Sequence, residues 1–125
     1  MRRVLALGFL AAAVFTTVGC GDNGSFRLSW ALSVGGVLES SSTACGKTGV
    51  DSIGILGHDT SGDSTQIRAL CTPGAATGSV PNGTWTFEVE MLDAEGNLIT
   101  PTAATDAGTV QSGGPVAEFA VTLMR

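Results

Sequence analysis

Basic residues and histidine are scarce in this sequence. Its 125 residues include 6 Lys and Arg against 11 Asp and Glu, and His58 is the only histidine. Nucleic-acid binding depends on Lys and Arg side chains that neutralise phosphates, so this balance argues against a nucleic-acid partner. No serine lies in a G-x-S-x-G motif, and no His, Cys or acidic residues cluster as they do in catalytic centres. We therefore expect neither an enzyme nor a bound cofactor.

Helical periodicity is also lacking. After residue 20, no stretch carries apolar residues at the i, i+3, i+4, i+7 spacing over the length of a typical helix. Apolar and polar residues alternate instead, most clearly where Trp85, Phe87, Val89 and Met91 are separated by Thr and Glu. This pattern predicts an all-β fold, an antiparallel β-sandwich of about seven strands or a small barrel, because each one-sided strand must bury its face against another sheet.

The expected strands can be placed along the chain. They lie at residues 26–33, 50–56, 66–71, 84–91, 98–99, 109–111 and 116–124, with polar loops at 39–43 and 101–108. A hairpin through residues 57–63 joins the second strand to the third. The aromatic residues of this region all fall on inward positions: Phe26, Trp30, Trp85, Phe87 and Phe119.

The N-terminal segment combines charge, apolar character and a cysteine. Arg2 and Arg3 precede an apolar run at residues 4–18, which ends at Gly19 and Cys20. As a helix this run would rise about 22 Å, short of the ~30 Å hydrocarbon core of a bilayer. The segment resembles a bacterial lipoprotein signal, whose lipobox would be residues 17–20. The resemblance implies cleavage after residue 19 and attachment of acyl chains such as palmitate to Cys20; the alternative is an ordinary secretory signal in which Cys20 is incidental.

That resemblance sets the expected organisation and location. Residues 1–19 form the signal peptide, 20–25 the lipidated cysteine and a short polar tether, and 26–125 the β-sandwich domain. Several acyl chains hold a protein durably, so the membrane is the expected partner. We expect a lipid-anchored protein of the bacterial cell envelope that faces the periplasm or the cell surface.

Cys45 and Cys71 remain once Cys20 is used for lipid attachment. An exported domain folds in an oxidising compartment, so these two cysteines are expected to form a disulfide, the alternative being two free buried thiols. A loop of this length gives a chain-entropy stabilisation of roughly 3.5 kcal/mol.

A second resemblance lies in the run PNGTWTFEVEMLDAEGN at residues 81–97. Its proline, glycine, aromatic, alternating strand and acidic turn look like the transthyretin-like and carboxypeptidase-regulatory-like sandwich modules; bacterial immunoglobulin-like modules are similar. These families are mostly adhesion, carbohydrate-associated or stability modules. The resemblance implies no catalytic residue in this chain.

The turn at residues 57–63 carries the candidate polar sites. His58 could act as a base for Ser61 or Ser64 in a hydrolase, although nothing in the spacing requires it. Asp59, Ser61 and Asp63 are candidate oxygen ligands for calcium, but the order departs from the D-x-[DN]-x-[DN]-G loop. We expect a solvated turn and no metal.

Two further pairs have a functional and a structural interpretation. Trp30 and Trp85 could stack on a sugar, but the alternation places both at inward positions, so we expect them to belong to the core. Glu88 and Glu90 could form a carboxylate pair, but an exposed strand face commonly carries such acids. The leading hypothesis is a non-catalytic envelope lipoprotein that binds another envelope protein or a glycan or gives structural support; the alternatives are a carbohydrate- or calcium-binding module, or a hydrolase that uses the 57–63 turn.

Overall fold

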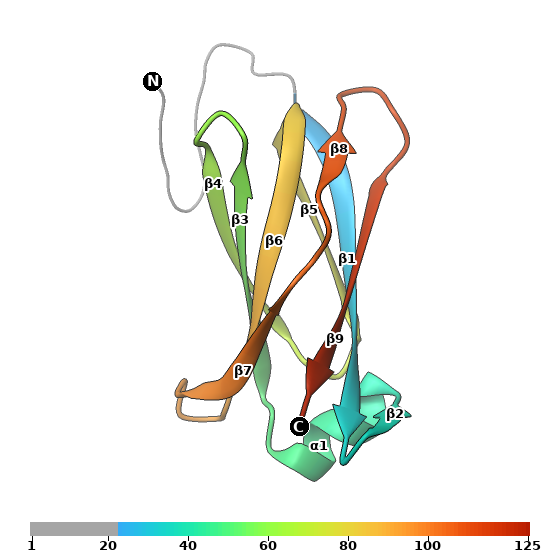
Figure 1. Cartoon of the computed structure of the whole chain (residues 1–125), viewed down its shortest axis with the longest axis vertical. Helices are drawn as coiled ribbons and strands as arrows, with labels where there is room; N and C mark the ends of the chain where they lie inside the picture. Colours follow the sequence, from blue (N-terminus) through green and yellow to red (C-terminus); the bar gives the residue numbers. More distant parts are fainter. Residues whose placement is uncertain (1–22) are drawn as a thin grey trace.

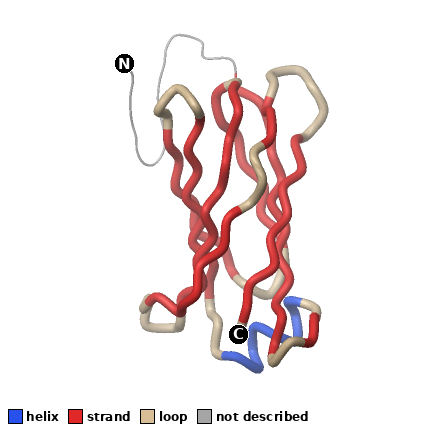
Figure 2. Tube along the Cα trace, in the orientation of Figure 1, coloured by secondary structure: helices blue, strands red, loops and turns tan. Residues whose placement is uncertain are grey.

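The computed structural model describes residues 23–125, which form two β-sheets packed face to face with one short helix at one end (Figures 1 and 2). The expected signal peptide, residues 1–19, and the expected lipidation site, Cys20, lie outside the described residues. The elements follow in the order β1 (Asn23–Val34), β2 (Val37–Glu39), α1 (Ser41–Thr48), β3 (Ser52–Asp59), β4 (Ser64–Leu70), β5 (Ala75–Pro81), β6 (Gly83–Leu92), β7 (Leu98–Ala104), β8 (Gly108–Val110) and β9 (Ala117–Met124). The predicted all-β class is confirmed.

The first sheet is built around the long strand β1. One edge of β1 pairs antiparallel with β5 and then with β2, and the other edge pairs with β9 in parallel along residues 26–33. The expected antiparallel sandwich is therefore wrong for one pair of strands, because β1 and β9 are parallel. Strand β8 ends at the end of the sandwich where β1 begins, and the loop after it reverses the chain, so β9 runs in the same direction as β1 (Figure 1).

The second sheet has the order β4-β3-β6, and β7 and β8 follow one another along the free edge of β6. The predicted hairpin is confirmed as the pair β3 and β4. The loop expected at residues 101–108 is wrong for residues 101–104, which belong to β7. Pro101 is accommodated because β7 is an edge strand, where a residue can lack an N–H without breaking a ladder.

Thr105 bridges the gap between β7 and β8. Its hydroxyl accepts a hydrogen bond from the backbone N–H of Phe87 at 3.1 Å, and its own N–H donates to the carbonyl oxygen of Phe87 at 2.9 Å. Both backbone groups of Phe87 are thus hydrogen-bonded on the side of β6 where neither β7 nor β8 pairs with this residue.

Three elements were not expected from the sequence pattern: the short strand β2, helix α1 and strand β5. Helix α1 replaces most of the polar loop predicted at residues 39–43. It buries Ala44 and Cys45, and it ends at Gly49, whose φ of 77° suits a glycine. Strand β5 contains small residues and only one fully buried large side chain, Val80, so its alternation is faint in the sequence.

The start of β1 also differs from the expected boundary. The strand begins at Asn23, so residues 23–25, expected to belong to the tether, are part of the first sheet. Gly24 is required there, since a Cβ on it would lie 2.7 Å from the backbone of Gln111. The sheet therefore starts within three residues of Cys20.

The core lies between the two sheets and is centred on aromatic rings. All five aromatic side chains predicted to face inward are buried. The ring of Phe87 is stacked on Phe26 at 4.6 Å between centroids and meets Phe119 edge-on at 4.8 Å. Glycines give these rings room: Gly57 pairs with Phe87 and Gly78 with Phe26, and a Cβ at either glycine would lie 2.7 Å from the ring.

No helix within residues 23–125 has the length and apolar character needed to cross a membrane.

Candidate functional site

A disulfide joins Cys45 in α1 to Cys71 just after β4, as the sequence predicted. The two Cα atoms are 5.9 Å apart and both side chains are buried. The bond attaches the helix to the end of the second sheet. Since α1 also follows β2 of the first sheet, the disulfide ties both layers together at this end of the sandwich (Figure 1).

Trp30 lies beside this disulfide and makes three hydrogen bonds. Its indole Nε1 donates to the carbonyl oxygen of Cys71 at 2.9 Å, its backbone N–H donates to Gly74, and its carbonyl accepts from the hydroxyl of Ser41 at 2.9 Å. At this residue β1 has left β5 and has not yet met β2. Gly74 and Ser41 therefore satisfy backbone groups that neither strand reaches.

The two tryptophans do not form a sugar-binding platform in this structure. Trp30 is 4% exposed and Trp85 is fully buried. The indole N–H of Trp85 donates to the carbonyl oxygen of Pro81 at 2.9 Å, so each polar tip is used internally. The preferred interpretation, that both belong to the core, is confirmed.

The β3–β4 turn contains the calcium candidates, and their polar atoms stabilise the turn. Asp59 Oδ1 accepts hydrogen bonds from the backbone N–H groups of Ser61 and Asp63 at 3.0 and 2.8 Å, and from the Ser61 hydroxyl at 2.8 Å. Gly62 has a φ of 100°, which a glycine adopts readily. Asp59 thus acts as the acceptor of an Asx turn.

The β6–β7 turn repeats the same arrangement at the opposite end of the second sheet. Asp93 Oδ1 accepts from the N–H groups of Glu95 and Asn97 at 3.0 and 2.9 Å, and Gly96 has a positive φ. Both turns have the pattern D-x-x-G-x. This repetition supports a structural role for Asp59, and no group of three or more His, Cys, Asp or Glu side chains in the described part of the chain is placed to hold a metal.

His58 lies on the outer face of β3 and is exposed. Its partners across the sheet are Ser64 on β4 and Thr86 on β6. The structure thus places His58 beside one of its two candidate nucleophiles, but within residues 23–125 no hydrogen bond joins the imidazole to Ser61 or Ser64. The hydroxyl of Ser61 is already bonded to Asp59. The described residues therefore show no histidine–serine hydrogen bond of the kind that activates a hydrolase nucleophile.

Glu88 and Glu90 lie on the outer face of β6. Glu88 is exposed, while Glu90 is half-buried and covers Gly54 of the neighbouring strand. A Cβ on Gly54 would lie 3.0 Å from Glu90 Cγ, so the glycine makes room for this side chain. The two acids lie on an open sheet surface, the arrangement that the structural interpretation predicts.

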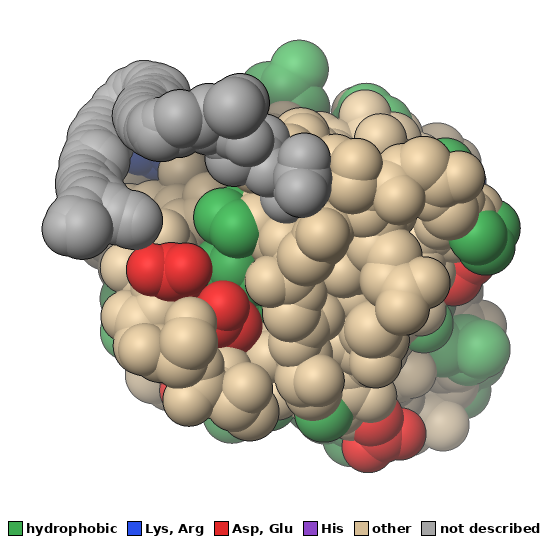
Figure 3. All heavy atoms as spheres, turned by 90° about the horizontal axis from the view of Figure 1, so that it is seen from above, with side chains coloured by type: hydrophobic (Ala, Val, Ile, Leu, Met, Phe, Trp, Pro, Cys, Tyr) green, Lys and Arg blue, Asp and Glu red, His purple; other side chains and the backbone are tan. Residues whose placement is uncertain are grey.

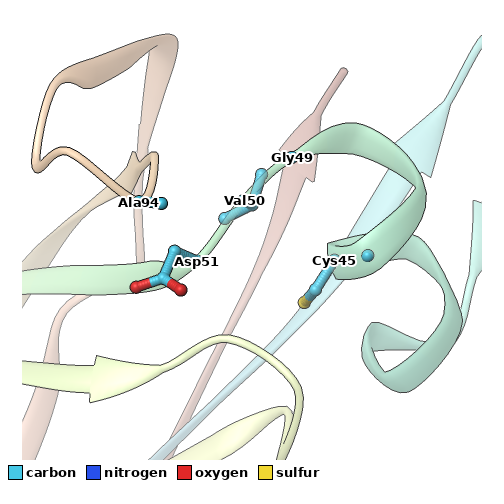
Figure 4. Close-up of a pocket in the computed structure, with 6 residues that line it drawn as sticks. Cys45, Gly49, Val50, Asp51 and Ala94 are labelled. Carbon is cyan, nitrogen blue, oxygen red and sulfur yellow. The ribbon is translucent and has the colours of Figure 1, made fainter.

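A shallow depression of about 220 Å³ lies between the end of α1 and the β6–β7 turn (Figure 4). It is lined by Cys45, Gly46, Gly49, Val50, Asp51 and Ala94. Asp51 contributes its only carboxylate. Pockets for small molecules typically hold about 300–1,000 Å³ and converge several polar groups, so this depression lacks the features of a ligand site.

Exposed apolar side chains gather at the α1 end of the sandwich, which sequence analysis did not identify. The most exposed are Leu38 and Leu70, each 65% exposed, and the others there are Val37, Leu98 and Met124. Leu70 and Leu98 lie in one row across the second sheet with buried Leu92, and Leu38 and Met124 lie in one row across the first. In the sequence, these residues could have been recognised as large apolar side chains near strand ends at positions that the alternation predicts to face solvent.

Comparison with known proteins gives a likeness of fold alone. No family model and no curated protein sequence matches this chain. The structure is similar to part of the crystal structure of a leucine-rich repeat protein from Bacteroides thetaiotaomicron, with a TM-score of 0.53 and 11% sequence identity. The similar region covers 93% of this chain and only 16% of that protein.

Proposed function

We propose that the protein is a lipoprotein of the bacterial cell envelope, held to the membrane by acyl chains on Cys20, and that its β-sandwich is a non-catalytic domain for binding or structural support. The observation that carries this proposal is the sequence of Arg2 and Arg3, the apolar run and the Gly19–Cys20 pair directly before a folded domain. Such a signal delivers a chain to the outside of the cytoplasm.

The disulfide supports the same location. Disulfides persist in oxidising compartments such as the periplasm and the cell surface, and are rare in the cytosol. Cys45 and Cys71 are bonded within a small domain, where a cross-link contributes a large share of the stability.

Of the sandwich modules that the sequence resembles, the transthyretin-like and carboxypeptidase-regulatory-like ones agree better with the strand grouping than the immunoglobulin-like ones do. In the constant-type immunoglobulin arrangement the first, second, fourth and fifth strands share one sheet. Here β1 shares its sheet with the short β2 and with β5 and β9, while β3 and β4 pair with one another in the other sheet, where β3 also pairs with β6. This grouping departs from the immunoglobulin one and supports a transthyretin-like or carboxypeptidase-regulatory-like module.

Metabolic labelling tests the anchor. Cells that express the full chain are given radioactive palmitate, and the protein is isolated and its intact mass measured. The wild-type chain should carry label and a mass increment for acyl groups on a chain that starts at Cys20, and Cys20→Ala should carry neither. The double variant Cys45→Ala/Cys71→Ala is the matched control, because it keeps only Cys20 and should still be labelled. A wild-type chain without label would overturn the proposal.

A further inference from the structure

We propose that the sandwich stands end-on at the membrane, with one particular end against the lipid headgroups and the α1 end directed away. The headgroup-facing end consists of the turns at residues 59–63 and 81–83 and the loop at 111–116, and is called the proximal end below. This inference rests on the proposed lipid anchor at Cys20 and adds the orientation of the domain and the surface that meets the lipid.

The first argument is the reach of the chain between anchor and domain. Only Gly21 and Asp22 separate Cys20 from Asn23, the first residue of β1. An extended chain spans at most about 3.6 Å per residue, so the Cα atoms of Cys20 and Asn23 are within about 11 Å in any conformation. The start of β1 is therefore held next to the membrane surface.

The second argument is that β1 is fixed in the sheet from its first residues. Asn23 pairs with Pro81 and Gly24 with Val80 on β5. Gly24 is buried against Val110 and Gln111, where even a Cβ would be too close at 2.7 Å. The chain is thus fixed in the sheet from Asn23 on, and only Gly21 and Asp22 lie between this fixed strand and Cys20.

The third argument is the layout of the elements around that point. β1 has 12 residues and runs the length of the sandwich (Figure 1). At about 3.3 Å per residue it places its far end roughly 36 Å from Asn23. Helix α1, strand β2 and the disulfide lie at that far end, together with the exposed side chains of Leu38 and Met124.

The surface of the proximal end suits contact with polar headgroups. Seen from above, it consists mostly of uncharged polar side chains and backbone, with scattered acidic and apolar side chains (Figure 3). Its two turns and loop contain no Lys or Arg, and their acids are Asp59 and Asp63. Asn82 Oδ1 accepts a hydrogen bond from the N–H of Ser112 at 2.6 Å, which joins the 81–83 turn to the 111–116 loop. The acyl chains, not attraction to anionic lipid, would hold this end in place.

The test uses energy transfer from single labelled sites to the membrane. The lipidated full chain is reconstituted in vesicles of phosphatidylethanolamine and phosphatidylglycerol that contain an acceptor-labelled lipid of short transfer distance. Donor dyes are attached to one new cysteine at a time: Thr60→Cys and Ser112→Cys at the proximal end, Ser42→Cys and Glu95→Cys at the far end. All four positions are exposed, and the native cysteines do not compete because two are bonded and one is acylated.

We expect several-fold greater transfer from positions 60 and 112 than from positions 42 and 95. A matched control carries a long Gly/Ser insertion between Asp22 and Asn23, which should reduce this difference because the domain can then rotate. Flotation of the vesicles separates the two hypotheses. Protein that floats but shows equal transfer from all four positions overturns the orientation alone, whereas a full chain without acyl groups that does not float overturns both the anchor and the orientation.

Discussion

The indole Nε1 of Trp30 donates its hydrogen bond to the carbonyl oxygen of Cys71, one of the two disulfide cysteines, at 2.9 Å. This contact joins the central strand of the first sheet to the residue that follows β4 in the second sheet. The residue next to the disulfide is held firmly, because Trp30 is buried and its backbone forms hydrogen bonds with Gly74 and Ser41. The α1 end is therefore held by a covalent bond and by hydrogen bonds that depend on the same residues.

Removal of the disulfide should lower stability substantially. The double variant Cys45→Ala/Cys71→Ala frees a loop closed over a sequence separation of 26 residues. The chain-entropy estimate predicts a loss of about 3.5 kcal/mol in the free energy of unfolding. Urea denaturation of residues 23–125 with and without reductant measures it. Wild-type protein should lose a similar amount on reduction, and the double variant should be insensitive to reductant; a variant as stable as the oxidised wild type would contradict the prediction.

The substitution Trp30→Phe should cost about 0.5–1.5 kcal/mol for the lost hydrogen bond, because the carbonyl of Cys71 then keeps only its longer bond from the Gly74 N–H at 3.2 Å. Loss of ring volume adds to this cost. Thermal unfolding followed by circular dichroism gives the change. Phe119→Leu serves as a comparison, since it changes a buried aromatic ring that makes no polar contact. If Trp30→Phe proves as stable as wild type, the Nε1 hydrogen bond has no net stabilising effect.

Gly78→Ala should destabilise the fold by about 1–3 kcal/mol, because a Cβ at this position would meet the ring of Phe26 at 2.7 Å. Gly46→Ala is the matched control. Gly46 lies inside α1 and a Cβ there would have no neighbour within 4 Å, so alanine should stabilise by about 0.5–1 kcal/mol through helix propensity. Opposite signs for the two substitutions in chemical denaturation are the expected outcome, and equal effects would count against the close ring contact.

Asp59→Ala and Asp93→Ala should each destabilise by about 1–2 kcal/mol, since each removes a carboxylate that accepts backbone N–H bonds across a turn. Asp106→Ala, at an exposed loop position, should change stability by less than about 0.5 kcal/mol. Equilibrium unfolding compares the three variants. A neutral result for either turn variant would show that its hydrogen bonds are replaced by water at no cost.

The same variants test the calcium alternative. Wild type and Asp59→Ala should show no rise in melting temperature on addition of calcium, because the Asp59 carboxylate is already used by the turn. Differential scanning calorimetry with calcium or with a chelator gives the answer. A calcium-dependent stabilisation of wild type that Asp59→Ala abolishes would restore the metal site.

Strands with strong alternation were predictable from the sequence, and strands with small residues were not. β6 alternates large aromatic and aliphatic residues with Thr and Glu, so its inward set was identified correctly. β5 was missed because Gly78 must leave space for Phe26, which removes the apolar side chain that would have marked the strand. The parallel pairing of β9 with β1 could not be predicted either. Alternation shows which face of the sheet a residue lies on, but it does not show in which direction the neighbouring strand runs.

The short-range features of the candidate site could be predicted, and the long-range ones could not. The pairing of Cys45 with Cys71 follows from the number of cysteines, and the presence of a turn between β3 and β4 follows from turn chemistry. Its expected bounds, residues 57–63, were wrong for residues 57–59, which belong to β3. Helix α1 is too short for a periodic signal and is fixed by contacts with Trp30 and Cys71 from distant parts of the chain. The partners of the two indole N–H groups likewise depend on the completed fold.

The parallel alignment of β1 with β9 has a mechanical consequence. The two strands lie side by side from Phe26 with Ala117 to Ser33 with Met124, and the ladder continues where Arg125 donates to the carbonyl of Ser33. A pull between the beginning of β1 and the C-terminus would act along both strands in opposite directions. Their hydrogen bonds would then be loaded together in shear instead of breaking one after another, so a domain tethered at one end and pulled at the other should resist force well.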